Sequence, residues 1–442
     1  MLTRVTTSEA IRRRNRARVL EALIRKGPST RLGLAAQCGL SGASAANMIQ
    51  DLLADGLVSE EGLARSKGGR PSVVVRADKD AAFFLGVDVG EAGVIIGLYD
   101  LTFDLRDVHR ATGLPRTAPP AQVSAALSVG LAELQKRNQD HWHRVLGLGL
   151  GLPGIVDTLN SDPAMLYAQN LGWPPIQVNE LCRIDGIPVV PDNGAKAYAR
   201  AELWRGAIAG PADAAYALVV VLGSGLGMGI LSQGTVMRGL SSSAGELGHV
   251  KVSRQGRRCT CGAVGCLEAQ MGGDALYAQW REAGGMEFSD QVSCARYIAD
   301  HWASDELAGR VLDDAIEYLA TGLSTAVNIL NPSICVIGGW LGELMMTARS
   351  DEIEARTKAL SLRHPAEQVR VVGTHLGRDG VALGAAIMAF EHLVEDSDGV
   401  EALASSGRVA RKRLAQSASA SRGYEDALLV GQTNTSTQGG DE

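Results

Sequence analysis

Apolar residues recur at helical spacing in three short segments at the start of the chain. The spacing predicts helices over residues 9–26, 31–37 and 42–55. Gly27-Pro28 ends the first helix, and Ser29-Thr30 can cap the second. The positions expected to face inward are Ile11, Val19, Leu20 and Leu23 in the first helix, and Met48, Ile49, Leu52 and Leu53 in the third.

Two strand-like segments, 57–60 and 73–76, follow the third helix. Between them lies the basic segment 64–71, which reads ARSKGGRP. Three helices followed by a basic hairpin are typical of a winged helix-turn-helix. We therefore expect residues 1–78 to form such a domain.

From residue 82 the pattern changes to apolar strands that alternate with Ala-rich helices. This alternation predicts an α/β fold with two sheet-centred lobes, residues 82–200 and 201–393. Residues 396–442 are rich in Ser, Ala, Gly, Gln and Thr and are expected to form a disordered tail, in which residues 408–414 could form a short helix. Strands are expected at 83–89, 94–99, 145–152, 189–190, 217–222 and 333–337, and helices at 121–135, 195–204 and 311–330.

The composition indicates which broad class of protein this chain belongs to. Hydrophobic residues make up 45% of the chain and charged residues 21%, as in soluble globular proteins. No apolar run approaches the roughly 20 residues that a membrane span needs. The basic N-terminus lacks the apolar core and cleavage site of a signal peptide. These features predict a cytoplasmic protein.

Charge is distributed unevenly. The whole chain carries a net charge of −6, whereas residues 1–75 hold 12 Lys or Arg against 6 Asp or Glu. A basic module on an acidic body suits a nucleic-acid binder, because attraction to phosphates supplies most of its non-specific affinity. Charge alone fits a solvated basic helix equally well.

Four residues of one segment have the types and the spacing of a metal site. His249, Cys259, Cys261 and Cys266 offer one nitrogen and three thiolates, a complete tetrahedral set for Zn²⁺. Because four protein ligands leave no position for water, the metal is expected to be structural, and a metal-dependent hydrolase is excluded. The remaining cysteines are expected to be core thiols: Cys38, Cys182, Cys294 and Cys335.

Several glycine-rich motifs resemble those of the ROK family, which groups bacterial repressors with sugar kinases. They are residues 147–157 (GLGLGLPGIVD), 170–173 (NLGW), and 221–230 (VLGSGLGMGI) followed by Gly239 and 246–249 (ELGH). The zinc motif is itself a hallmark of the family. The resemblance covers residues 82–393 and implies an actin/hexokinase-like (ribonuclease H-like) pair of lobes with a sugar cleft. An N-terminal winged helix is what the family's repressors have and its kinases lack.

The kinase motifs are degenerate at positions that phosphoryl transfer needs. Glu91 and Ala92 replace a Gly and the Thr of the kinases' phosphate-binding turn, and a carboxylate there would repel phosphate. Gly194 and Lys196 replace the catalytic Asp and the second Asn of the N-D-x-N motif. We therefore predict a protein that is not an enzyme. An alternative register would make Asp192 the base of an ATP-dependent sugar kinase.

The resemblance also indicates which residues would contact an effector. Carboxylates suit sugars because each can accept two hydroxyl donors, although Glu246 and Glu268 can equally support the zinc loop. Lys196 in the cleft raises the hypothesis of an acidic sugar or a sugar phosphate. A regulator that no longer responds to sugar is a further alternative. The expected effector contacts are Asn193, Lys196, Glu246, His249 and Glu268.

In a helix-turn-helix the N-terminal residues of the second helix of the motif meet base edges in the major groove. Asn47 can pair with adenine, and basic wing residues can reach the minor groove or the backbone. The expected DNA contacts are Ser41, Gly42, Ala43, Ser44 and Asn47 in the helix and Arg65, Lys67 and Arg70 in the wing, where Gly69-Arg70-Pro71 resembles a segment of the family's repressors.

Together these features predict a sequence-specific transcriptional regulator, expected to repress. Its partners would be double-stranded operator DNA and a sugar, sugar phosphate or related small molecule. The family implies a homodimer or homotetramer.

Overall fold

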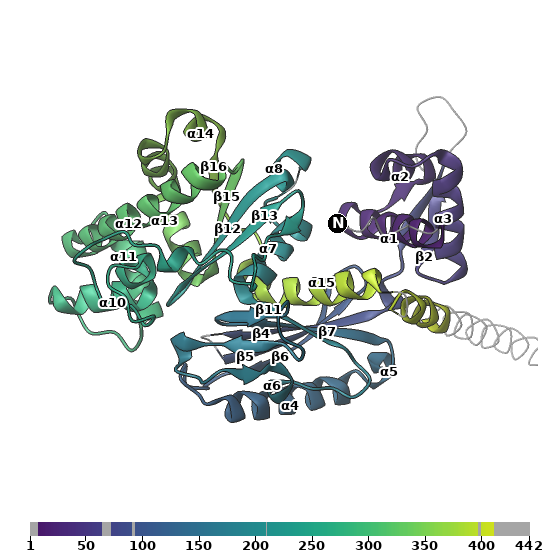
Figure 1. Cartoon of the computed structure of the whole chain (residues 1–442), viewed down its shortest axis with the longest axis horizontal. Helices are drawn as coiled ribbons and strands as arrows, with labels where there is room; N and C mark the ends of the chain where they lie inside the picture. The colour runs from purple at the N-terminus through teal and green to yellow at the C-terminus, as the bar shows by residue number, and fades with distance from the viewer. Residues whose placement is uncertain (1–7, 64–71, 91–92, 209, 397–398, 411–442) are drawn as a thin grey trace, which may run out of the picture. The chain divides into compact units, whose positions relative to one another are not determined.

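The computed structural model describes residues 8–63, 72–90, 93–208, 210–396 and 399–410 (Figure 1). The chain forms two compact units. Unit 1 comprises Met1–Phe83, Asp100–Asp104 and His392–Glu442, and unit 2 comprises Phe84–Tyr99 and Leu105–Glu391. Among the described helices, none is both long and apolar enough to cross a membrane.

Unit 1 begins with the three predicted helices and a small sheet, in which β1 joins the two predicted strands. Thr30 accepts a hydrogen bond from the Gly33 amide at the start of α2, and Ser41 accepts one from the Ser44 amide at the start of α3. Gly39 ends α2 in the left-handed conformation. The antiparallel sheet has the order β1-β3-β2. The elements are α1 (Ser8–Lys26), β1 (Ser29–Thr30), α2 (Arg31–Cys38), α3 (Gly42–Ala54), β2 (Val58–Leu63), β3 (Val73–Ala77) and η1 (Lys79–Ala81).

The core of this small domain is built from the predicted apolar stripes, with two exceptions, Ile11 and Leu53, of which Leu53 is half-buried. Val19, Leu20 and Leu23 of α1 are buried, and so are Met48, Ile49 and Leu52 of α3. The prediction for Ile11 was wrong, because its side chain is 50% exposed. The buried stripe of α1 starts at Val19, where the helix packs on α2 and α3.

The chain after α15 differs from the predicted disordered tail. Residues 399–410 are helical, and Leu403, Ala404, Ser406 and Ala410 are buried. Ser406 Oγ donates to the Ala81 carbonyl at 2.6 Å, and Arg408 pairs with Asp55 at 2.6 Å. The composition hid this helix because its apolar surface is small and is buried against residues far away in the chain. Residues 411–442 of the predicted tail lie outside the described residues.

Gly407→Val is expected to loosen this domain. A Cβ atom at Gly407 would lie 2.3 Å from the Asp55 carbonyl oxygen and 2.9 Å from Leu57 Cδ2, so backbone would have to shift. Overpacking of this kind costs about 1–3 kcal/mol. Hydrogen exchange measured by mass spectrometry should show faster exchange in α1, α2 and α3. Ser405→Val places the same side chain on an exposed position of the same helix, and equal exchange in both variants would contradict the prediction.

Unit 2 contains two five-stranded sheets, which confirms the predicted α/β class. The first has the order β11-β7-β4-β5-β6, and the second has the order β14-β13-β12-β15-β16. Strands β12, β15 and β16 are parallel, as are β7 and β11. A third, small sheet has the order β10-β9-β8. The strands are β4 (Phe83–Gly90), β5 (Gly93–Asp100), β6 (Leu105–Ala111), β7 (Val145–Leu152), β8 (Ile155–Asp157), β9 (Met165–Tyr167), β10 (Ile176–Gln177), β11 (Val189–Asn193), β12 (Tyr216–Leu222), β13 (Leu226–Ser232), β14 (Thr235–Val236), β15 (Ile334–Gly338) and β16 (Arg370–Gly373).

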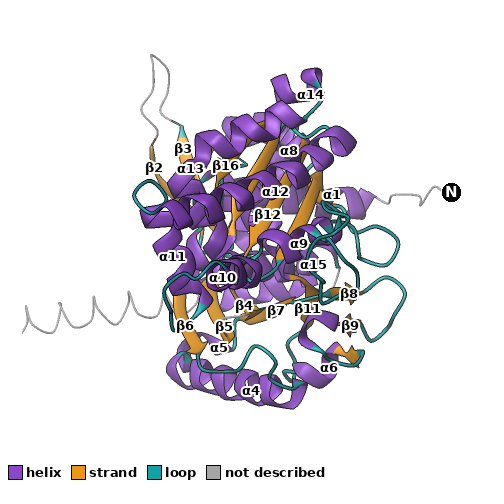
Figure 2. Ribbon diagram, turned by 90° about the vertical axis from the view of Figure 1, so that its left-hand side faces the viewer, coloured by secondary structure: helices purple, strands orange, loops and turns teal. Residues whose placement is uncertain are grey.

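Helices cover these sheets (Figure 2). Helix α13 packs on β12, β15 and β16, and α12 packs on α13. The helices are α4 (Pro120–Arg137), α5 (Gln139–Trp142), α6 (Val178–Leu181), α7 (Gly194–Arg205), α8 (Pro211–Ala215), α9 (Leu267–Met271), α10 (Gly273–Glu282), α11 (Gln291–His301), α12 (Glu306–Leu330), α13 (Gly339–Leu360), α14 (Arg363–Gln368) and α15 (Gly380–Glu395), with short η2 (Gln169–Leu171), η3 (Leu247–His249) and η4 (Gly377–Asp379).

Helix α7 contacts strands of both large sheets, β7 and β11 on one side and β12 and β13 on the other. Small residues allow this close packing. A Cβ atom at Gly229 would lie 2.5 Å from Ala199 Cβ, and one at Gly227 would lie 2.9 Å from Ala195 Cβ. These glycines of the 221–230 motif therefore serve the packing of β13 against α7.

Candidate functional site

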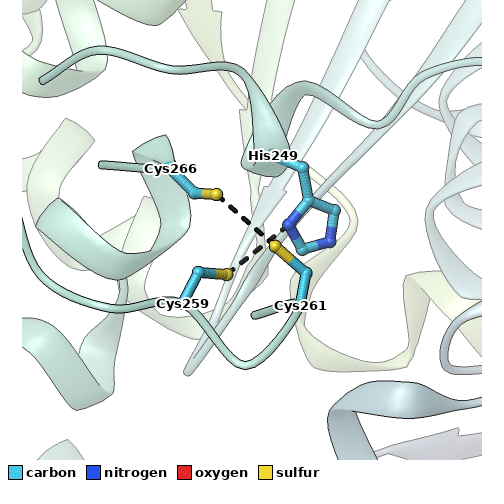
Figure 3. A group of neighbouring side chains, drawn as sticks. All are labelled: His249, Cys259, Cys261 and Cys266. Atoms are coloured by element: carbon cyan, nitrogen blue, oxygen red, sulfur yellow. Dashed lines mark hydrogen bonds between the residues drawn. The ribbon is translucent and has the colours of Figure 1, made fainter. Parts of the chain in front are cut away.

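The predicted metal ligands lie together in unit 2 (Figure 3). His249 ends η3, Cys259 and Cys261 lie on the following loop, and Cys266 directly precedes α9. One ligand atom from each of the four residues lies within 4.8 Å of all the others. Cys259 Sγ is 3.6 Å from His249 Nδ1, and Cys261 Sγ is 3.6 Å from Cys266 Sγ.

Backbone pairing and two glycines shape this loop. Gly262 and Gly265 have φ angles of 90° and 80°, a region that disfavours other residues. A Cβ atom at Gly265 would lie 1.7 Å from the Ser253 carbonyl oxygen, so this position requires glycine. The Cys259 amide donates to the Ala263 carbonyl at 2.8 Å. The turn thus brings three sulfurs to one side of the loop.

The donor set fits a tetrahedral zinc ion. Zn–S bonds of about 2.3 Å place two sulfurs of a tetrahedron about 3.8 Å apart, close to the separation of Cys261 and Cys266. A hydrogen bond from the Ala263 amide lowers the pKa of the Cys261 thiol to about 7, which favours the thiolate that binds metal. Burial raises the pKa of Cys259 to about 11, so an ion would have to displace its proton.

Beside this cluster lies a cavity of about 440 Å³. Its lining combines apolar groups, such as Trp173, with polar and charged ones, as small-molecule sites do. Residues from the motifs at 147–157 and 170–173 contribute to it. Among the lining residues are Val89, Gly90, Arg116, Pro153, Asn170, Leu171, Trp173, Ser224, Gly225, Arg257, Arg258, Cys259, Glu268 and Asp274.

Glu268 connects the cavity to two other features. Its Oε2 accepts a hydrogen bond from the Leu226 amide at 3.0 Å, and its Oε1 lies 3.9 Å from Cys259 Sγ. A Cβ atom at Gly225 would lie 2.5 Å from Glu268 Oε2, so the glycine admits the carboxylate. Glu268 is therefore shared by the cavity, the Gly223–Leu226 turn and the metal cluster.

The other predicted effector contacts lie outside the residues that line this cavity. Asn193 Oδ1 accepts from the amides at the start of α7, and its Nδ2 donates to the Gly154 carbonyl at 2.8 Å. Lys196 is 1% exposed, and its Nζ donates to the Ser242 carbonyl at 2.6 Å. Glu246 lies 4.0 Å from His249 Nε2, beside the metal cluster. Lys196 therefore gives no support to an anionic effector.

Asp192, the alternative catalytic base, is held in a buried ionic network. It is 0% exposed, and its Oδ2 lies 3.2 Å from Arg200 Nη1 and 3.0 Å from Arg238 Nη2. Its Oδ1 accepts from the Asn193 amide at 2.8 Å. Both oxygens of this carboxylate are thus already engaged by partners within the protein. Burial lowers the pKa of nearby Lys196, while Asp192 and Glu246 oppose this shift.

The start of α3 presents small and polar residues to solvent. Ser41, Gly42, Ala43 and Asn47 are exposed, whereas Ser44 is half-buried. Gln50 is also exposed, one helical turn beyond Asn47. Gln50 is not among the predicted DNA contacts, although its spacing places it on the same face of the helix as Asn47. Arg65, Lys67 and Arg70 of the predicted wing, and likewise Glu91 and Ala92, lie outside the described residues.

Three arginines of α1 bind within the protein. Arg12 forms a bidentate pair with Asp51 of α3, and Arg16 pairs with Asp55 at 2.5 Å. Arg18 donates to the carbonyl at the end of α2, on Cys38, at 2.6 Å. These contacts hold α1 on the other two helices, so part of the basic character of residues 1–75 is structural.

Comparison with known proteins identifies the family to which this chain belongs. The ROK family model matches residues 84–392, more than half of the chain. The chain belongs to the ROK family. The xylose repressor of Caldicellulosiruptor bescii is 26% identical over 363 residues, covering 78% of this chain and 88% of the repressor. The glucokinase of Halalkalibacterium halodurans is 28% identical over 323 residues, covering 68% of this chain and 93% of the kinase.

A solved ROK structure extends the match to most of the chain. It is a ROK family transcriptional regulator, a homologue of the Escherichia coli Mlc protein, with a TM-score of 0.70 and 24% identity. The match covers 89% of this chain and 99% of that regulator. The fold of this ROK chain is thus that of a whole ROK regulator.

Proposed function

We propose that this ROK protein is a cytoplasmic, sequence-specific DNA-binding transcriptional regulator that represses its target genes. The observation that carries the proposal is the three-helix and hairpin domain of unit 1, which precedes the ROK region. The xylose repressor is a relative of this chain, and the regulator structure covers 89% of it. We infer a homodimer or homotetramer, because paired half-sites require paired DNA-binding domains.

The site chemistry supports a regulator rather than a kinase. Gly194 has no side chain that could accept a hydroxyl proton, and Asp192 is engaged by Arg200 and Arg238. In the ROK unit the zinc ion would be held by His249, Cys259, Cys261 and Cys266. It would supply structural cross-linking of the loop, since four protein ligands complete its coordination.

The cavity is the proposed effector site. Its volume of about 440 Å³ suits a small molecule, and Glu268, Asn170 and Arg116 offer hydrogen-bonding groups beside Trp173. Such a mixture fits a sugar or sugar derivative, whose hydroxyls need polar partners and whose ring carbons pack on an aromatic face. Effector binding would act on DNA affinity through a difference in affinity between two conformations.

We assign DNA reading to α3 and the wing. Asn47 can form paired hydrogen bonds with adenine, and Gln50 can do the same one turn later. Gly42 and Ala43 permit close approach to the groove, and Ser41 and Ser44 can bind phosphates. The wing residues Arg65, Lys67 and Arg70 are proposed to contact the minor groove or the backbone.

Operator binding with and without sugars tests the proposal. The full-length protein is titrated with its promoter-proximal DNA at two salt concentrations, in the presence and absence of a pool of sugars and sugar phosphates. We expect sequence-specific binding that one member of the pool weakens. Absence of specific binding at either salt concentration would overturn the proposal, as would ATP-dependent phosphorylation of a sugar.

Asn47→Ala is expected to weaken operator binding about 5- to 150-fold. Loss of one bidentate base contact costs about 1–3 kcal/mol, and the base preference at one position should relax. Fluorescence anisotropy with operator variants measures both effects. Gln135→Ala removes an exposed amide from α4 of the ROK unit and should leave the affinity unchanged. Equal affinities for the two variants would remove Asn47 from the DNA contacts.

A further inference from the structure

A lysine contacts one of the metal-binding sulfurs. Lys251 Nζ lies 2.7 Å from Cys266 Sγ, and the same ammonium group donates to the His249 carbonyl at 3.2 Å. The cluster motif does not include Lys251. Its contacts nevertheless span two of the four ligands, one through the side chain and one through the backbone.

The backbone holds Lys251 at this position. Lys251 forms an isolated antiparallel bridge with Cys266, and the Leu267 amide donates to the Val250 carbonyl at 2.9 Å. On the same strip the Val252 amide donates to the Gly265 carbonyl at 2.9 Å. Residues 250–252 are thus paired with residues 265–267 on both sides of Lys251. This pairing fixes the Lys251 backbone beside Cys266, so the side chain reaches the sulfur at a small cost in conformational entropy.

The net charge of the occupied metal site gives a cation beside Cys266 a stabilising effect. Three thiolates and a neutral imidazole around Zn²⁺ leave a net charge of −1, and the Glu268 carboxyl lies 3.9 Å from Cys259 Sγ. Cys266 is 0% exposed, so water cannot solvate its thiolate. A buried anion requires a charged or hydrogen-bonding partner. Two neighbouring arginines are directed elsewhere: Arg257 pairs with Glu282, and Arg258 donates to the Gly262 carbonyl.

We infer that Lys251 is a positioning residue of the zinc site, which donates a charge-assisted hydrogen bond to the Cys266 thiolate. The bond balances the negative charge of the metal cluster and slows release of the ion. This role is independent of the proposed DNA and sugar binding.

Zinc transfer from the full-length holoprotein to a chromogenic chelator tests the inference. Hydrogen-bonding partners of metal ligands typically contribute 10- to 100-fold in metal affinity. Since Lys251 is exposed, we expect Lys251→Met to accelerate transfer roughly 10-fold, and Lys251→Arg, which keeps a donor and a charge, to stay near the wild-type rate. Lys358→Met makes the same substitution on α13, where Lys358 pairs with Glu354, and should leave the rate unchanged.

Cobalt substitution gives a readout that a loss of packing would not produce. Hydrogen bonding to a thiolate raises the energy of its sulfur-to-cobalt charge-transfer band. The band of the Co²⁺-loaded Lys251→Met protein should therefore shift to longer wavelength, and that of Lys251→Arg should not. Wild-type rates and an unshifted band in Lys251→Met would overturn the inference. Equal acceleration in the Met and Arg variants would also overturn it, as would wild-type protein that binds no Zn²⁺.

Discussion

Cys266→Ser is expected to abolish stoichiometric zinc binding and to lower the free energy of unfolding of unit 2 by several kcal/mol. The Cys266 sulfur is fully buried and lies 3.6 Å from that of Cys261, so a weaker oxygen ligand would break the tetrahedral set. A ligand that binds only the folded state stabilises it by about 4 kcal/mol when its concentration is 1,000 times its Kd. The variant loses this contribution.

Two measurements check this result. Metal analysis gives the zinc content per chain, and tryptophan fluorescence in urea reports on unit 2, because Trp142, Trp173, Trp204, Trp280, Trp302 and Trp340 all belong to it. Cys294→Ser makes the same change at a buried thiol of α11 outside the cluster and should retain one zinc ion. A Cys266→Ser protein with one zinc ion per chain would contradict the prediction. So would an unfolding curve of the wild type that a chelator leaves unchanged.

Asp192→Ala is expected to cost unit 2 about 3–5 kcal/mol of stability. The substitution removes the carboxylate that Arg200 and Arg238 share and takes an opposite charge away from the buried Lys196, although Arg200 keeps its pair with Glu391. Breaking a buried ion pair from one side has an effect of this size. Tryptophan fluorescence in urea again follows the unit concerned.

A surface carboxylate provides the control for Asp192. Asp351→Ala, on an exposed position of α13, should change stability by less than about 0.5 kcal/mol. Asp192→Asn tests the kinase alternative. If Asp192 were a catalytic base, the wild-type protein would turn over ATP and the variant would not. If the carboxylate is structural, neither protein turns over ATP. Equal stabilities of the Asp192→Ala and Asp351→Ala proteins would refute the buried network as a stabilising element.

Local features of the structure were readable from the sequence. The helices of unit 1 follow from apolar spacing and from capping residues such as Thr30 and Ser41, whose hydrogen bonds lie within three residues. The metal cluster was readable for a similar reason. Its three cysteines lie within eight residues of one another, and Gly262 and Gly265 allow one turn to bring them together.

The proposed effector site was less readable, because its geometry depends on partners distant in the chain. Asn193 and Lys196 have the residue types of sugar contacts, yet their side chains bind the carbonyls of Gly154 and Ser242. Glu268 lines the cavity as the family resemblance implies. Sequence spacing does not distinguish Asn193 and Lys196 from Glu268, because the atoms that each side chain contacts come from other strands and loops.

The sequence by itself determined the three helices of unit 1, the α/β class of unit 2 and the membership of the metal cluster. Periodicity, capping and ligand spacing act over a few residues, so they can be read along the chain. The tertiary structure alone decided that Asp192 and Lys196 are buried and paired, that Arg12 and Arg16 bind α3, and that residues 399–410 form a packed helix. The function of a charged or weakly apolar side chain depends on whether folding removes it from water, and that depends on residues far away in the sequence.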